Sequence, residues 1–410
     1  MSAGGESLWD SPLAITACMC ACVAAYGVYL ALPLILGALS DVYHFSSRDI
    51  GWTGAAENAG LLLGSVLVSA LAKTGRFRAL MLAGILIAML GNAITSGVHS
   101  FAPMAGIRLL TGFGSGICYS AGIACLSLMR QSARHFSVFI VILVIANSLE
   151  LWLVPSLLAA LGLPGLYFGF GLAFIVPLML LRAVPQVARN LAAVPAPAEA
   201  GGAAAADQPG AAEGAREAPP LLLRLAWWCL FAIVMFNVAA SAFWAYSERI
   251  GASLGMSPQA VANTLTLCNL FSLTGGVFAY WLSRRWGQHR PQLAALSVMM
   301  LVFGFWAVSI GTASYIVGVL IFFEIWSMTQ VYQLGTLNGI DANGQYVALV
   351  PAAQGLGQSA GPFIAGALLG WKFGYSEVML SMLAFIAACF GAYLLVYLRL
   401  KRRQPQLAAT

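Results

Sequence analysis

The sequence predicts an all-helical protein that crosses a membrane many times. Of its 410 residues, 60% are hydrophobic and 8% are charged, and the mean hydropathy is +0.86. Soluble domains carry about 25% charged residues, so this chain has too few charges to cover a water-exposed surface. The composition therefore argues against soluble enzymes and nucleic-acid-binding proteins. At about 20 residues per membrane-spanning helix, the chain has room for about ten to twelve spans.

Apolar stretches between charged or Gly/Pro-marked breaks predict twelve spans. In the first half of the chain these are 13–38, 49–71, 79–98, 103–128, 137–160 and 164–183. In the second half they are 221–247, 258–282, 292–311, 314–336, 345–370 and 376–399. Each is close to the length that crosses about 30 Å of hydrocarbon as a helix. The expected domains are six-helix halves over 1–183 and 221–403, followed by a tail over 404–410.

A segment of different composition separates the two halves. Residues 184–220 end in AVPAPAEAGGAAAADQPGAAEGAREAPP, which is rich in Ala, Pro, Gly and Glu. Such a composition cannot bury enough apolar surface to form a core, and it is typical of a flexible linker.

The positions of Lys and Arg predict the orientation. Sixteen of the twenty basic residues fall in the linker, in the C-terminal tail or in the loops after spans 2, 4, 6, 8 and 10. Basic residues collect on the cytoplasmic side of a membrane protein, so both termini and the linker are expected in the cytoplasm. The membrane itself is expected to be the plasma membrane, which in bacteria is the inner membrane. Topology thus explains the basic residues, and no nucleic-acid partner is expected.

A short pattern recurs in both halves at an offset of 212 residues. It consists of a glycine, a basic residue, a second glycine and an arginine: Gly64, Lys73, Gly75 and Arg78, then Gly276, Arg285, Gly287 and Arg290. The repeat supports a chain built from two related six-helix halves. That layout, with cytoplasmic termini and a central cytoplasmic linker, is found in many secondary transporters.

Three motifs resemble those of the major facilitator superfamily. The stretch VSALAKTGRFR fits the G-x-x-x-D-R-x-G-R-R loop motif at Lys73, Gly75 and Arg76, although Ala72 stands at the aspartate position. The second-half copy, YWLSRRWGQHR, keeps Arg285 and Gly287 and also lacks the acid. In span 4, RLLTGFGSG fits R-x-x-x-G-x-G-x-G with Arg108, Gly112, Gly114 and Gly116. In span 11, Gly357, Gly361 and Pro362 fit the G-x-x-x-G-P-x-x-G antiporter signature, which span 5 lacks.

The resemblance implies the 12-span transporter fold of that superfamily, and it implicates Arg108 in proton coupling. The glycine pairs also have a physical meaning, because glycines four residues apart allow two helices to approach closely. Pro362 frees a carbonyl and permits a bend. Both features suit helices that move against each other, and both are equally compatible with ordinary tight packing.

Four ionisable residues lie well inside expected spans: Glu57, Arg108, Glu150 and Glu324. A charge near the bilayer centre costs about 2.5–3.5 kcal/mol, so these groups have to be paired, hydrated or neutralised. Burial favours the protonated form of a carboxyl group, which makes the three glutamates candidates for proton coupling alongside Arg108. The alternatives are an ion pair between Arg108 and Glu57 or Glu150, and helix–helix hydrogen bonds made by protonated acids.

Polar and aromatic residues inside the spans are candidates for lining a substrate cavity. They are Tyr26, Tyr29, Tyr119, Asn147, Asn237, Trp244, Asn269, Gln330, Gln333, Gln354 and Gln358. Gln330/Gln333 and Gln354/Gln358 are spaced to place two amides on one helix face, where lipid would leave them unsatisfied. For the aromatic residues, anchoring against lipid is the alternative.

The sequence gives no support for an enzyme, a metal site or a cofactor. GQSAG at 357–361 matches G-x-S-x-G, but it lies in an apolar helical stretch, and the four histidines fall at loops or span ends. The eight cysteines lie in apolar segments without metal or redox spacing, so they read as small buried hydrophobes.

The expected function is therefore secondary transport by alternating access, with a small organic solute bound between the two halves. A buried arginine with amide and aromatic neighbours suits an organic anion, such as an aromatic or aliphatic carboxylate. Proton-coupled uptake by a monomer is expected, and proton-antiport efflux of drugs or metabolites is the runner-up. The alternative from another class is a transporter-like receptor that moves no solute.

Overall fold

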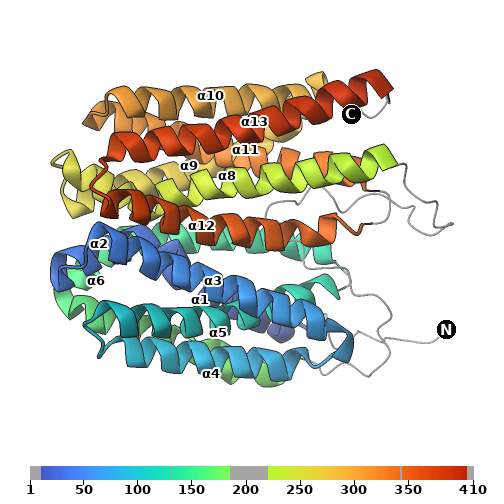
Figure 1. Ribbon diagram of the computed structural model, residues 1–410. Helices are drawn as coiled ribbons and strands as arrows, with labels where there is room; N and C mark the ends of the chain where they lie inside the picture. Colours follow the sequence, from blue (N-terminus) through green and yellow to red (C-terminus); the bar gives the residue numbers. More distant parts are fainter. Residues whose placement is uncertain (1–10, 130, 185–219, 342–343, 404–410) are drawn as a thin grey trace, which may run out of the picture. The chain divides into compact units, whose positions relative to one another are not determined.

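The computed structural model describes residues 11–129, 131–184, 220–341 and 344–403, which form helices joined by short turns (Figure 1). No strand occurs among these residues. The chain divides into two compact units, Met1–Glu199 and Ala200–Thr410. The dividing point falls in 185–219, outside the described residues, as do the tail residues 404–410. The linker over 184–220 and the domain boundaries drawn from it stay predictions.

Each unit is a bundle of helices that follow one another with short connections (Figure 1). The first unit contains α1 (Pro12–Leu30), α2 (Leu32–Tyr43), α3 (Ser47–Leu71), α4 (Phe77–Thr95), α5 (Phe101–Ser127), α6 (Ser132–Ala173) and α7 (Ile175–Leu180). The second contains α8 (Pro220–Ser253), α9 (Pro258–Trp286), α10 (His289–Val308), α11 (Thr312–Ile340), α12 (Val350–Gly370) and α13 (Tyr375–Arg403).

The helices account for all twelve expected spans. Ten helical runs in the described part of the chain are long and apolar enough to cross a membrane. One of them, Arg134–Ala183, has 50 residues and is interrupted at Gly162, where φ is 67°, so it supplies two crossings. The twelfth is α12, whose 21 residues are not among the ten runs. The predicted all-helical, polytopic membrane fold is confirmed.

Several helix boundaries differ from the prediction by about four to six residues, and two of the differences have a clear cause. The span expected over 13–38 is two helices, because α1 ends at Leu30 and α2 restarts at Leu32 with Pro33 in its first turn. A proline lacks the N–H that would continue the first helix and is favoured at a helix start. The seventh span was expected to end at residue 247, but α8 continues to Ser253 and carries Glu248 and Arg249 on the helix.

In the first unit, α5 packs against both α3 and α4 with its backbone in close approach (Figure 1). Gly112 of α5 lies against the carbonyl of Glu57, and Gly116 against the carbonyl of Leu61. A Cβ atom at either glycine would overlap α3 backbone, and a Cβ atom at Gly114 would meet the backbone nitrogen of Ala88 on α4. The tight contact expected from this motif is therefore present, and it fixes Glu57 beside α5.

The second unit uses the same device between α8 and α12. Gly357 lies against Asn237, and Gly361 lies against Ser241 and the carbonyl of Val238. The Ser241 hydroxyl donates to the Gly357 carbonyl at 3.1 Å. Through Pro362 the helix α12 continues without interruption.

The glycines of the sequence repeat have the same backbone role in both halves at the turns, but different surroundings inside the helices. Gly75 (φ 65°) and Gly287 (φ 71°) both end a helical segment in the left-handed region, where glycine is favoured. Gly64 packs against the α5 backbone, whereas a side chain at Gly276 would meet open space. The close-packed glycine of α9 is the neighbouring Gly275.

Two arginines of the loop motif and its second-half copy lie at the surface. Arg76 and Arg285 are exposed, and the Arg285 guanidinium sits 4.3 Å from the centre of the Trp281 ring. The side chain of Lys73 lies outside the described residues.

Candidate functional site

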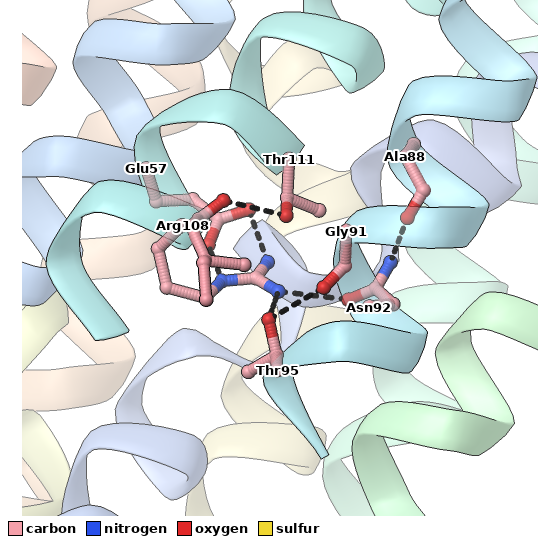
Figure 2. Close-up of polar contacts among 8 residues, drawn as sticks. Glu57, Ala88, Gly91, Asn92, Thr95, Arg108 and Thr111 are labelled. Carbon is pink, nitrogen blue, oxygen red and sulfur yellow. Dashed lines mark hydrogen bonds and ion pairs between the residues drawn. The ribbon is translucent and has the colours of Figure 1, made fainter. Parts of the chain in front are cut away.

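Arg108 is the centre of a closed polar network in the first unit (Figure 2). Its side chain is completely buried on α5 and forms a two-pronged ion pair with Glu57 of α3. Nε donates to Glu57 Oε2, and Nη2 donates to Oε1 at 2.6 Å. Paired N–H···O bonds of this kind are the strongest arginine–carboxylate geometry. Glu57 is itself only 4% exposed.

The other side of the guanidinium is held by α4 (Figure 2). Nη1 donates to Asn92 Oδ1 at 2.8 Å and to Thr95 Oγ1 at 3.4 Å. The Asn92 amide donates to the Ala88 carbonyl at 3.0 Å, which fixes its oxygen toward the arginine. The ring of Tyr167, on α6, lies 5.1 Å from Arg108 Cζ. The charge is thus balanced, and its donors are directed at protein groups.

The sequence leaves two roles open for Arg108, in proton coupling and in an ion pair with a glutamate. The observed geometry is that of an ion pair with Glu57, and it leaves the guanidinium without donors directed at a solute carboxylate. Asn92, Thr95 and Tyr167 were not identified from the sequence. An amide inside the apolar span 79–98 was the available signal for Asn92, because lipid would leave it unsatisfied.

Glu150 is placed differently from Glu57. Its Oε2 is buried on α6 and has no hydrogen-bond partner among the described residues. A Cβ atom built on Gly27 of α1 would lie 3.2 Å from Glu150 Oε1 and 3.3 Å from the Phe170 ring. One turn earlier on the same helix, Asn147 is 8% exposed, and its Oδ1 also lacks a partner in the described part of the chain. Glu150 and Asn147 thus form a polar face of α6 on which two buried oxygens have no hydrogen-bond partner among the described residues.

The three tyrosines expected at a cavity come together in the first unit. Tyr26 of α1 stacks on Tyr119 of α5 with ring centres 4.2 Å apart, and Tyr29 meets Tyr26 edge-on at 5.1 Å. All three are at least nine-tenths buried, so none of them is a lipid-facing anchor. They join α1 to α5.

Glu324 of α11 has one partner. The Thr274 hydroxyl of α9 donates to its Oε1, and Gly275 provides the space in which the carboxyl group sits. Its Oε2 has no hydrogen-bond partner among the described residues. Glu324 is therefore half satisfied, between the closed pair of Glu57 and the open carboxyl of Glu150.

The remaining cavity candidates are buried amides and one indole in the second unit. Asn237, Trp244, Asn269, Gln333, Gln354 and Gln358 are each less than 9% exposed, and Gln330 is partly exposed. Gln354 Nε2 donates to Gln330 Oε1 at 2.6 Å, joining α12 to α11. Trp244 packs edge-on against Phe323 of α11 at 5.7 Å.

One charged pair on α8 was not identified from the sequence. Glu248 is 3% exposed, and Arg249 donates to it from Nε at 2.6 Å and from Nη2 at 3.0 Å. Both residues were assigned to a loop, because hydropathy falls where the charges begin. The hydrogen bond from Tyr315 to the Ser247 carbonyl, at 2.8 Å, shows that this end of α8 is packed against α11.

Comparison with known proteins identifies the family. The model of the Major Facilitator Superfamily matches residues 17–340. The chain belongs to the major facilitator superfamily. The predicted family is confirmed, and a member of this superfamily is an integral membrane transporter rather than an enzyme. A search of curated proteins gives no match.

Solved structures of other superfamily transporters share the fold. A bacterial homolog of the human lysosomal transporter Spinster has 11% identity and a TM-score of 0.71, covering 96% of this chain and 98% of that one. The nucleoside transporter NupG has 11% identity and a TM-score of 0.68, covering 94% and 99%. The human organic anion transporter MFSD10 has 17% identity and a TM-score of 0.62, covering 94% and 100%.

Proposed function

We propose that this superfamily member couples the uptake of a small organic solute to protons, and that Glu150 carries the proton. The observation that carries the proposal is the open carboxyl of Glu150, which has a buried oxygen with no partner among the described residues. An isolated carboxylate out of water is costly, and such a group binds a proton instead. Glu57 is a weaker candidate, because Arg108 already neutralises it.

The direction of transport rests on span 5, which carries Glu150. This span lacks the G-x-x-x-G-P-x-x-G pattern that antiporters place there, and this absence favours uptake over efflux. Proton-antiport efflux of drugs or metabolites is the alternative, and no contact among the described residues favours it.

The class of solute depends on whether a buried arginine such as Arg108 is available to bind an anion. An organic anion was expected because a buried arginine could grip a carboxylate. Arg108 and Arg249 are both paired with glutamates within their own unit, so an anion would have to displace one of these pairs. Solved relatives include a transporter of nucleosides and one of organic anions, so both classes belong in the test.

Transport assays in proteoliposomes test the coupling. Labelled nucleosides, sugars and organic acids are offered with and without an inward proton gradient. We expect the wild-type protein to concentrate at least one solute only when the gradient is present. Glu150→Gln mimics a permanently protonated acid, so it should exchange solute across the membrane without concentrating it.

Glu377→Gln is the matched control, because Glu377 is an exposed acid at the start of α13. It should concentrate solute like the wild-type protein. Full accumulation by Glu150→Gln would remove Glu150 from the proton role. If Glu57→Gln and Glu324→Gln also accumulate fully, coupling through a buried carboxyl is wrong. Accumulation in inside-out vesicles would indicate efflux.

A further inference from the structure

We propose that the second unit binds an uncharged, hydrogen-bonding solute through a cluster of four amides: Asn237 of α8, Gln330 and Gln333 of α11, and Gln354 of α12. This amide cluster names the class of solute that the proposed transport function moves, and the inference rests on that function. It differs from the expectation of an organic anion.

Contacts between α8 and α11 set the register of the two helices. Toward the start of α11 the Tyr315 hydroxyl donates to Ser247, and further along the Phe322 ring lies 4.6 Å from Phe243. The two helices therefore run in opposite directions: moving forward along α11 means moving backward along α8. Continuing six residues past Phe322 and Phe243 brings Thr329 close to the level of Asn237, and Gln333 follows one turn further along α11.

Helical periodicity places these residues on facing surfaces. Asn237 lies seven residues before Trp244, which is about two full turns, so both share the face of α8 that meets Phe323 of α11. Gln333 lies 11 residues after Phe322, about three turns, on the face of α11 that meets Phe243. Asn237 and Gln333 thus belong to the packed α8–α11 faces.

The third helix joins through direct contacts. Asn237 packs against Gly357 of α12, at a position where any side chain on α12 would collide with it. Gln354 is three residues before Gly357, on a neighbouring part of the same face. Its amide nitrogen donates to Gln330 Oε1 at 2.6 Å. The amides of α8, α11 and α12 therefore gather where these helices meet.

Half of the eight side-chain polar atoms in the amide cluster are buried without a partner among the described residues. Asn237 Oδ1, both polar atoms of Gln333 and Gln354 Oε1 are buried without a hydrogen bond among the described residues. Asn237, Gln333 and Gln354 are 0%, 2% and 8% exposed, so the groups are enclosed rather than solvated. More than 90% of buried polar groups in proteins are partnered, so four open atoms where three helices meet call for an explanation, and we assign them to solute binding.

The open atoms define the chemistry of that ligand. Three are carbonyl oxygens that accept, and one is an amide nitrogen that donates. A ligand with several O–H or N–H groups and at least one acceptor satisfies them, as a sugar, a nucleoside or a carboxamide does. A carboxylate brings only acceptors and would face three carbonyl oxygens. The nearest acid on α11, Glu324, is nine residues before Gln333, on the opposite face and bonded to α9.

Ligand-induced shifts in melting temperature of the purified full-length protein test this proposal without a proton gradient. The probes are three pairs that differ in a carboxylate: galactose and galacturonate, nicotinamide and nicotinate, and uridine and orotidine. We expect at least one uncharged member to raise the melting temperature, with no shift from its carboxylate partner. A shift from the carboxylates alone, or from none of the uncharged probes, contradicts the assigned class.

Gln333→Leu and Asn237→Leu test the amides themselves. Each replaces an amide that has open polar atoms by an apolar group, so the ligand-free protein should melt at a higher temperature than the wild type. The same variants should weaken binding of the uncharged probe by about tenfold, since they remove one or two ligand hydrogen bonds. Asn263→Leu, at an exposed amide on α9, is the matched control and should leave probe binding unchanged.

The outcomes separate this inference from the proton mechanism. A lower melting temperature of ligand-free Gln333→Leu and Asn237→Leu would show that the amides stabilise the fold, and the site would be wrong. The same holds if these variants bind the uncharged probe with wild-type affinity. Neither result depends on Glu150, and loss of coupling in Glu150→Gln leaves both measurements unaffected.

Discussion

The main polar clusters of the two units are buried in opposite ways. The cluster of the first unit holds a full positive charge and closes it completely, with Glu57, Asn92 and Thr95 bonded to Arg108. The cluster of the second unit holds neutral amides and leaves several of their atoms open. An unpaired buried charge costs far more than an unpaired amide, so a charge has to be satisfied inside its unit. Open groups are therefore best built from amides. Glu150 and one oxygen of Glu324 are exceptions, because a proton can neutralise a carboxyl group.

The largest expected effect comes from breaking the closed charge pair. Arg108→Leu leaves the carboxylate of Glu57 buried and alone, and losing one partner of a buried pair costs about 3–5 kcal/mol. The melting temperature of the purified protein should fall steeply, and Arg108→Leu/Glu57→Gln should recover much of the loss. Arg48→Ala, at a half-exposed arginine, should change little. A double variant as unstable as Arg108→Leu would contradict the account.

A methyl group at the α3–α5 contact should act through packing. Gly112→Ala places a Cβ atom against the carbonyl of Glu57, and overpacking costs about 1–3 kcal/mol. Gly106→Ala, on the same helix α5, meets nothing within 4 Å and should stabilise by up to about 1 kcal/mol. Thermal unfolding of both variants shows whether alanine destabilises α5 only at the contact with α3 or anywhere along the helix. Equal changes in melting temperature for Gly112→Ala and Gly106→Ala would contradict the close α3–α5 contact.

The smallest effect compares the starts of α3 and α9, which stand at corresponding places in the two units. Ser46 and Asp49 cap α3 reciprocally, whereas Ser257 caps α9 through one bond from Ala260. Ser46→Ala should cost about 1 kcal/mol, and Ser257→Ala should cost less. Unfolding of the two variants in the same detergent measures the difference. A larger loss for Ser257→Ala would contradict the reciprocal cap.

The fold could be predicted from the sequence because hydropathy alone specifies membrane-crossing helices. Gly75 and Gly287 were expected in loops at span ends, and both end a helical segment with a positive φ. The interruption of the first span was missed, although Pro33 marks it. A 26-residue apolar stretch without a charge gave hydropathy no reason to divide it.

The candidate site was only partly predictable. The sequence identified Arg108 and Glu57 as buried, but 51 positions separate them, and their pairing depends on how closely glycines let α3 approach α5. The sequence also ranked the three glutamates inside the expected spans alike. Their environments, closed for Glu57, half satisfied for Glu324 and open for Glu150, arise from partners on other helices.

Proton coupling and solute recognition are thus assigned to groups in different units. Counterflow exchange and proton-driven accumulation can be measured on the same proteoliposomes with Glu150→Gln and Gln333→Leu, which separates the two roles. Glu150→Gln should keep the wild-type KM for exchange and lose accumulation. Gln333→Leu should raise the KM about tenfold and still accumulate solute at saturation. A raised KM in Glu150→Gln, or lost proton dependence with an unchanged KM in Gln333→Leu, would contradict this assignment.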